Sequence, residues 1–206
     1  MFYNVFIMQK PYTILLFGRS GCGKGTQAKL LMDYLEKQDG KDSMLYVYTG
    51  EKMRELVQRD SFTAKLANKI LLAGGKQPDF LAVWAWSNEM VEKLKENIHL
   101  VIDGSPRTSI EAKILDGAFD FYKRENIKPV LIDVSPEEVM ARLLARKRED
   151  DTEEQIKNRL AYYEKYVAPA VEYYRKESKN KLIVVDGNPH DVNLIHKNIL
   201  AATGLE

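Results

Sequence analysis

A glycine-rich segment near the N-terminus has the residue types and spacing of a phosphate-binding loop. It reads GRSGCGKGT, from Gly18 to Thr26, between an apolar run and a long helical pattern. Glycines let backbone N–H groups turn toward phosphate oxygens, and the following helix N-terminus adds partial positive charge. We therefore expect nucleotide phosphates at Gly21, Cys22, Gly23, Lys24, Gly25 and Thr26, with the Lys24 charge on the β and γ phosphates and the Thr26 hydroxyl oriented toward magnesium or its water. A turn without a ligand is the weaker alternative.

An acid and an arginine follow a second apolar run, in the segment VIDGSPR that ends at Arg107. In an open α/β sheet, ligands bind at the carboxyl ends of the strands, so Asp103 should face the same crevice as the phosphate loop. A carboxylate there can hold water around Mg²⁺, and the planar guanidinium of Arg107 can bind a phosphate through two N–H groups. Taken alone, an Asp-Gly-x-Pro segment is more often only a turn.

Arginines gather again in the second half of the chain. Arg142 and Arg146 are four residues apart on one predicted helix face, and Arg148 and Arg159 follow. Clustered guanidinium groups can neutralise the charge that phosphoryl transfer concentrates on the transferred group. A solvated charge run explains this segment equally well when it is taken alone.

The pattern around these residues predicts the elements that position them. Short β-branched or aromatic runs alternate with helical patterns, which is typical of a parallel α/β sheet. The expected strands are residues 13–17, 44–48, 100–103, 130–134 and 182–186. The expected helices are 24–37, 52–58, 63–72, 80–96, 109–125, 136–146, 153–176 and 191–201. Residues 50–79 carry helix but no strand, so we expect a flap there.

Composition bounds the classes of protein that remain. The 206 residues hold 31 Lys plus Arg and 30 Asp plus Glu, so a net charge of +1 gives no global case for nucleic acid or an anionic membrane as partner. The single cysteine, Cys22, excludes an internal disulfide and a multi-thiolate structural zinc site, and favours a reducing compartment. No apolar run approaches the roughly 18 to 20 residues of a membrane span, so we expect a soluble cytoplasmic protein.

Together these segments resemble the adenylate kinase family of nucleoside monophosphate kinases, over nearly the whole chain. The matching pieces are GRSGCGKGTQA, YTGEKMRE, AGGKQPD, VIDGSPRT, RLLARKREDD, TEEQIKNRL and VVDGNP. The resemblance implies a three-layer α/β/α P-loop NTPase fold with a five-stranded parallel sheet, forming one kinase domain over residues 1–206. It implies a helical insertion that binds the nucleoside monophosphate (NMP) at residues 49–79. The implied reaction transfers the γ-phosphoryl group of ATP, with Mg²⁺, to a monophosphate, foremost AMP.

The resemblance also assigns roles. Lys24 would bridge the donor and transferred phosphates, and Asp103 would place Mg²⁺. For ATP, Arg142 would stack on the adenine and Asn188 and Pro189 would pass beside it. The acceptor residues would be Thr49, Arg54, Lys76, Gln77, Gly104, Arg107, Glu111, Arg148 and Arg159. Arg146, Arg148 and Arg159 would neutralise the transition state, oriented by Asp150 and Asp151.

Two departures from the family pattern leave alternatives open. Residues 146–151 have room only for a vestigial lid, so we expect water to be excluded by the arginines, the flap or a second subunit; a homo-oligomer is thus possible. Glu111 stands where the family usually has a glutamine reading the acceptor base. An ionised carboxylate only accepts hydrogen bonds, which suits guanine, although Thr49 fits the AMP pattern; alternatively, Glu111 points to solvent.

Three other interpretations remain. The acceptor could be CMP or UMP. The chain could be a nucleotide-binding partner protein without turnover, which the retained lysine and arginines disfavour. Cys22, at a helix N-terminus, could be an oxidisable thiol or simply a small residue.

Overall fold

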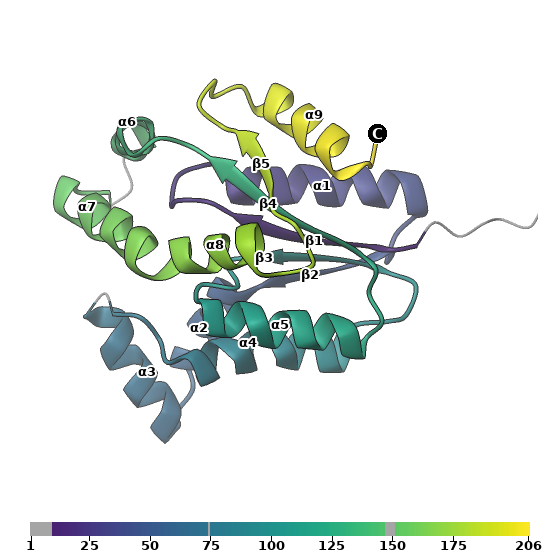
Figure 1. Ribbon diagram of the computed structural model, residues 1–206. Helices are drawn as coiled ribbons and strands as arrows, with labels where there is room; N and C mark the ends of the chain where they lie inside the picture. Colours follow the sequence, from purple (N-terminus) through teal and green to yellow (C-terminus); the bar gives the residue numbers. More distant parts are fainter. Residues whose placement is uncertain (1–9, 74, 147–150) are drawn as a thin grey trace, which may run out of the picture.

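A central sheet with helices on both faces organises the chain (Figure 1), and the computed structural model describes residues 10–73, 75–146 and 151–206. The strands are β1 (Tyr12–Phe17), β2 (Met44–Tyr48), β3 (His99–Asp103), β4 (Asn126–Asp133) and β5 (Ile183–Asp186). They lie in the order β2-β3-β1-β4-β5, and every neighbouring pair is parallel. The predicted five-stranded parallel sheet is confirmed.

The register of the sheet brings the ends of its central strands together. Leu16 of β1 and Tyr48 of β2 both pair with Asp103 of β3, and Phe17 pairs with Leu131 of β4. All residues of β1 and β3 are buried, because helices cover both faces of these strands. The segments that follow β1, β2, β3 and β4 therefore leave from one edge of the sheet.

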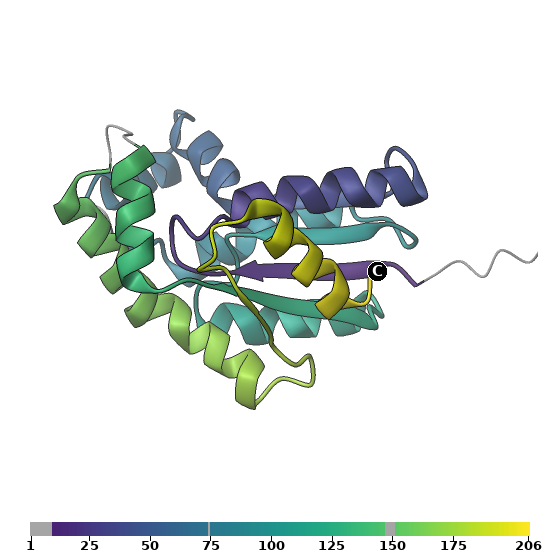
Figure 2. The same ribbon diagram turned by 90° about the horizontal axis from the view of Figure 1, so that it is seen from above.

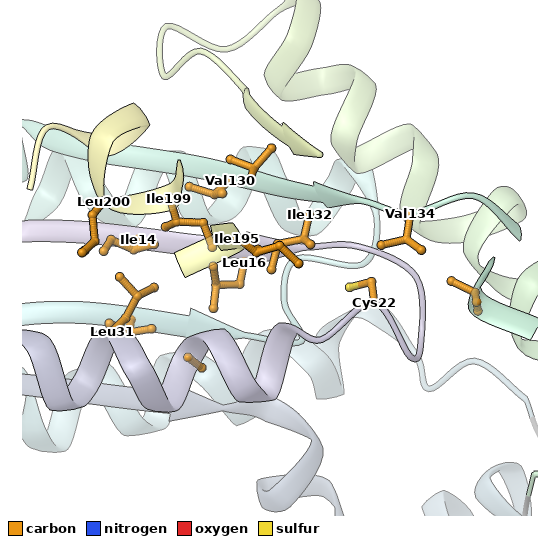
Figure 3. Close-up of a cluster of buried hydrophobic side chains, with 14 of the residues drawn as sticks. Ile14, Leu16, Cys22, Leu31, Val130, Ile132, Val134, Ile195, Ile199 and Leu200 are labelled. Atoms are coloured by element: carbon orange, nitrogen blue, oxygen red, sulfur yellow. The ribbon is translucent and has the colours of Figure 1, made fainter. Parts of the chain in front are cut away.

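Two clusters of buried side chains flank the sheet. On one face, α1 (Lys24–Asp39) and α9 (Val192–Thr203) lie side by side, as Figure 2 shows from above. Their side chains meet Ile14, Leu16 and Ile132 of the sheet in the cluster of Figure 3. On the other face pack α4 (Asp79–Lys93), α5 (Ser109–Phe121) and α8 (Ala168–Lys176). The outcome is the predicted three-layer arrangement.

Several element boundaries differ from the prediction for local reasons. Helix α5 ends at Phe121 instead of residue 125, because Lys123 takes a left-handed φ of 52° and Arg124 turns inward to donate to Thr13 Oγ1 at 2.8 Å. Strand β4 begins at Asn126 instead of residue 130, and Pro129 pairs with Leu15 within it.

The insertion between β2 and β3 begins with α2 (Thr49–Val57) and α3 (Phe62–Leu72). Helix α2 starts three residues before the predicted residue 52, despite the poor helix propensity of Gly50. Ser61 caps α3 by accepting a hydrogen bond from the Ala64 N–H at 3.1 Å. Leu56, Ala67 and Leu81 form a third, small cluster under these helices. The assignment of residues 49–79 as a flap for the acceptor stays a prediction.

The predicted helix over residues 153–176 has its predicted bounds, but it is not α-helical throughout. The structure has α7 (Glu153–Tyr162), a π-helical turn η1 (Tyr163–Val167) and then α8. Pro169, in the first turn of α8, has no N–H to continue an i→i−4 ladder, and the wider turn directly precedes it.

The vestigial lid predicted at 146–151 falls largely outside the described residues, as do Arg148 and Asp150. Before it, α6 (Pro136–Arg146) has its predicted bounds. Within the described ranges, no helix has the length and apolar character to cross a membrane, and no three or more His, Cys, Asp or Glu side chains gather as potential metal ligands.

Candidate active site at the carboxyl edge of the sheet

The glycine-rich loop joins β1 directly to α1, as predicted. A Cβ at Gly18 would lie 2.7 Å from the carbonyl oxygen of Ile132, so only glycine lets the loop pack on β4. At Gly23, where φ is 98°, and at Gly25, a Cβ would meet no described atom within 4 Å apart from those of the adjacent residues and of the same helix backbone. The first turn of α1 contains no acidic side chain. The start of α1 therefore presents open backbone N–H groups and the positive end of the helix dipole, which suits an anion.

The Lys24 ammonium is held inside this loop. Its Nζ donates hydrogen bonds to the carbonyl oxygens of Gly18 at 2.6 Å and Arg19 at 3.0 Å. Thr26 lies exposed in the first turn of α1. The loop thus carries a full positive charge beside its open backbone, as the sequence predicts.

Asp103 ends β3 next to the loop and is only 5% exposed. Burial raises the pKa of this carboxyl, while Lys24, a hydrogen bond from Tyr46 and the charge of Arg107 oppose the rise. Tyr46 on β2 donates its hydroxyl to Asp103 Oδ2 at 3.2 Å. The sequence analysis did not identify Tyr46 as a site residue. Its place two residues before the end of β2, the strand that pairs with β3, could have indicated it.

Arg146 and Arg159 converge on one buried carboxylate. Arg146 donates from Nε and Nη2 to the two oxygens of Asp151, at 2.8 and 2.9 Å, and Arg159 Nη2 donates to Asp151 Oδ1 at 2.8 Å. The bonds from Arg146, followed by those from Arg159, hold the pKa of Asp151 well below its ordinary value against the effect of burial. The structure thus assembles these three predicted residues, which a simple solvated charge run would leave apart.

Arg142 points toward the loop after β5. Its Nε donates to Glu138 at 2.7 Å, and Nη2 donates to the carbonyl oxygens of Gly187 at 2.7 Å and Asn188 at 3.1 Å. The Asn188 side chain accepts from the Ser135 N–H at 2.9 Å, and Pro189 next to it is exposed. The three predicted donor-base residues are therefore neighbours.

A buried polar chain links three residues behind the insertion. Thr49 Oγ1 donates to Ser105 Oγ at 2.8 Å, and Ser105 Oγ lies 3.5 Å from Glu111 Oε2. Glu111 is 2% exposed, so the alternative in which it points to solvent is wrong. Burial raises the pKa of Glu111, and the backbone N–H and charge of Arg107 oppose that rise. Ser105, to which the sequence assigned no role in the site, is the middle member of this hydrogen-bonded chain.

The other predicted acceptor residues surround this chain. Arg107 Nε donates to the Gly104 carbonyl at 2.8 Å, and the Arg54 guanidinium lies 5.2 Å from the centre of the Tyr48 ring. Lys76 forms an ion pair with Asp79, whose Oδ1 also accepts from Thr108 at 3.3 Å. Gln77 instead donates to the Ala67 carbonyl at 2.8 Å, which ties it to α3.

Cys22 faces the core instead of the open side of the loop. It is 1% exposed and lies among Leu16, Ile132 and Val134 (Figure 3). This burial favours the interpretation of Cys22 as a small packing residue over that of an oxidisable thiol.

Comparison with known proteins agrees with this geometry. The family model described as "Adenylate kinase" matches residues 16–179. A protein named adenylate kinase from Petrotoga mobilis is 32% identical, covering 91% of this chain and 96% of its own. One from Azobacteroides pseudotrichonymphae is also 32% identical, over 90% of this chain and 93% of its own, and one from Chlamydia trachomatis is 29% identical over 87% and 85%. With its phosphate loop and arginine cluster at one sheet edge, the chain belongs to the adenylate kinase family of nucleoside monophosphate kinases.

Proposed function

We propose that this enzyme transfers the γ-phosphoryl group of ATP to AMP and so forms two molecules of ADP. The proposal rests on two observations in a chain of this family: an open helix N-terminus beside Lys24, and the Arg146–Asp151–Arg159 cluster. The relatives named adenylate kinase support AMP as acceptor.

On the donor side, the N–H groups of Gly21, Gly23 and Gly25 bind the ATP phosphates, and Lys24 and the Cys22 N–H exchange their loop carbonyls for phosphate oxygens. Arg142, Asn188 and Pro189 border the adenine. On the acceptor side, Arg54 and Arg107 bind the AMP phosphate, with Arg148, while Thr49, Gly104, Lys76, Gln77 and Glu111 surround the nucleoside. No general base of unusual pKa is required, because positioning and electrostatics supply most of the catalysis of phosphoryl transfer.

Arg146 and Arg159 act on the charge that develops in the transition state. Because Asp151 accepts hydrogen bonds from both guanidinium groups, it holds the two arginines in fixed positions. Such preorganised charge stabilises the transition state without reorganisation during the reaction. Arg148 and Asp150 would extend the cluster.

The residues at the end of β3 fit a magnesium ion. Asp103 offers a buried carboxylate whose rise in pKa is opposed by Lys24, and Thr26 offers an exposed hydroxyl at the start of α1. Oxygen ligands of this kind, reached in part through water, are those that Mg²⁺ takes. When bound, the ion would neutralise part of the charge on the phosphates. Tyr46, through its bond to Asp103 Oδ2, orients the carboxylate.

The acceptor base could alternatively be guanine, on the strength of one residue. A neutral Glu111 has one donor and one acceptor, as glutamine has, and matches the edge of adenine; an ionised Glu111 only accepts and matches the two N–H groups of guanine. Initial rates with AMP, GMP, CMP and UMP, for the wild type and Glu111→Gln, decide between them. AMP as the preferred acceptor of both enzymes supports the proposal, whereas a preference for GMP that Glu111→Gln abolishes supports guanine.

A coupled assay with ATP, Mg²⁺ and each monophosphate, repeated with Arg107→Ala, tests the function as a whole. We expect turnover in the wild type and a loss of at least about 100-fold in the variant at unchanged folding, because a bidentate phosphate ligand is removed. A folded wild type that binds ATP without turning over any monophosphate would instead be a nucleotide-binding partner protein.

The same assay without acceptor addresses the short segment at 146–151. With so little chain to cover ATP, water exclusion falls to the arginines, the insertion or a second copy of the chain. Release of phosphate that falls as protein concentration rises would support a homo-oligomer. We place the enzyme in the cytoplasm, where its substrates are.

A further inference from the structure

Arg19, the second residue of the phosphate loop, has a guanidinium that the roles above do not use. Its Nη2 donates to Glu164 Oε1 at 2.7 Å, and its Nη1 donates to the Val134 carbonyl at 3.0 Å and lies 3.3 Å from Asp133 Oδ1. The guanidinium also lies 4.6 Å from the centre of the Tyr163 ring. The side chain is only 15% exposed. This arginine of a phosphate loop is therefore bound to protein groups on several sides.

The partners of Arg19 lie on two elements that leave the phosphate edge. Val134 and Asp133 are at the end of β4, whereas Tyr163 and Glu164 open the π-helical turn η1. Tyr163 is 6% exposed, and its backbone N–H donates to the Arg159 carbonyl. The turn that Arg19 contacts is thus hydrogen-bonded directly to Arg159, whose side chain binds Asp151. Wider π turns are frequent at functional sites.

The backbone of Arg19 reaches the other half of the site. Its carbonyl oxygen accepts hydrogen bonds from Lys24 Nζ at 3.0 Å and from the Cys22 N–H at 3.1 Å. One residue therefore contacts the lysine of the donor site with its main chain and the helix of the arginine cluster with its side chain.

We propose that Arg19 is a positioning residue that sets the place of Arg159 relative to Lys24 during phosphoryl transfer. The inference rests on the function proposed above. Ile156 of α7 is buried in the core cluster, and Arg19 adds a polar tie between this helix, which carries Arg159, and the end of β4. A displacement of a charged group by about 1 Å can lower a rate up to about 100-fold, so this tie has a measurable consequence.

The kinetic test compares Arg19→Gln, Glu164→Gln and the double variant. We expect kcat to fall about tenfold in Arg19→Gln and less in Glu164→Gln, with the double variant no slower than Arg19→Gln, because both act through one contact. KM for ATP stays within about twofold of the wild type. Arg19→Lys, which keeps the charge but loses the planar fork, recovers part of kcat. In an Arg159→Ala background, Arg19→Gln has no further effect.

The matched control is Arg175→Gln. Arg175 pairs with Glu172 at 2.9 Å on α8, is half-exposed and touches no residue of the site, so its loss leaves kcat unchanged. A raised KM for ATP at unchanged kcat in Arg19→Gln would make Arg19 a nucleotide ligand and overturn the proposal. A full tenfold loss in the Arg159→Ala background would overturn it as well.

Hydrogen exchange of the free protein separates this proposal from the proposed function. We expect faster amide exchange over residues 153–163 in Arg19→Gln and normal exchange there in Arg175→Gln. If amide exchange over residues 153–163 is faster in Arg19→Gln but the wild type shows no turnover, the contact between Arg19 and η1 is supported and the kinase function is refuted. Unchanged amide exchange over residues 153–163 in Arg19→Gln would refute the positioning role of Arg19, whatever turnover the wild type shows.

Discussion

The phosphate loop continues from β1, every residue of which is buried, whereas the helices α2 and α3 rest on a separate cluster of Leu56, Ala67 and Leu81. The loop packs Gly18 on β4 and Cys22 in the core. On α3, by contrast, Phe62 is 78% exposed and Leu72 is 80% exposed. Regions with few buried apolar contacts open at low free energy, so the two halves of the site should differ in stability. A rigid donor half beside a yielding acceptor half suits an enzyme that must admit a second nucleotide.

The strongest test of the rigid half is Lys24→Met. We expect kcat to fall by about 100- to 1,000-fold, because a charge placed for the transition state is lost while the length of the side chain is kept. Thermal unfolding should change little, since the hydrogen bonds of the ammonium, to the carbonyls of Gly18 and Arg19 and to Cys22 Sγ, all lie within the loop. Lys29→Met, at an exposed position of α1, is the control and should retain full activity. Equal activity of the two variants would remove Lys24 from the mechanism.

Two leucine truncations compare the halves directly. Leu31→Ala, at a position with 0% exposure beside β1, should lower the free energy of global unfolding by about 3 kcal/mol. Leu56→Ala, at 5% exposure, should act locally: faster amide exchange confined to residues 49–72, and a KM for AMP raised about tenfold at an unchanged ATP affinity. A global loss of similar size in both variants would show that the halves unfold as one unit.

A smaller effect is expected at the carboxylate that joins the arginines. Asp151→Asn should destabilise the protein by about 1 to 2 kcal/mol at neutral pH, because it weakens a pair of ionic hydrogen bonds whose arginines are partly exposed. The folded pKa of Asp151 is lowered, so its stabilisation is present above the unfolded pKa of about 3.9 and is lost as pH falls toward the folded value. Denaturant unfolding from pH 7 to pH 2.5 should therefore show the free energies of unfolding of the wild type and Asp151→Asn converging.

The smallest effect is expected in the acceptor half, at Glu111. Its folded pKa is raised, so the carboxyl favours folding below its unfolded pKa and loses that contribution as pH rises through the folded value. Glu111→Gln has no such charge to bury and should be more stable than the wild type at pH 8 by up to about 1 kcal/mol. If the difference in free energy of unfolding between Glu111→Gln and the wild type is the same at pH 5 and pH 8, Glu111 does not titrate in this range.

Much of the donor half could be predicted from sequence because local chemistry determines it. The loop from Gly18 to Thr26 carries its own turn residues, cation and helix start, and the carboxyl-edge rule places Asp103 beside it. The five-stranded parallel sheet and the confirmed enzyme class follow from the same pattern together with the family resemblance.

The contacts that could not be predicted join residues distant in sequence. Arg19 lies 145 positions from Glu164, and Thr49 lies 56 from Ser105, so no local spacing signals either pair. The burial of Glu111 likewise depends on the packing of α5 and not on its neighbours in the chain. The helix break at η1 was missed because Pro169 lies within an apolar pattern that continues on both sides.

Because of the π-helical turn η1, the orientation of α7 relative to α8 depends on the number of residues in that turn. Each residue of an α-helix turns the chain by about 100°. Removing one residue between Tyr163 and Val167 would let the ordinary ladder close, and α7 would rotate by roughly that angle while Tyr174 stayed seated in the core. Arg159 would then swing away from Asp151. A deletion or an insertion in this segment would therefore change which way the arginine faces.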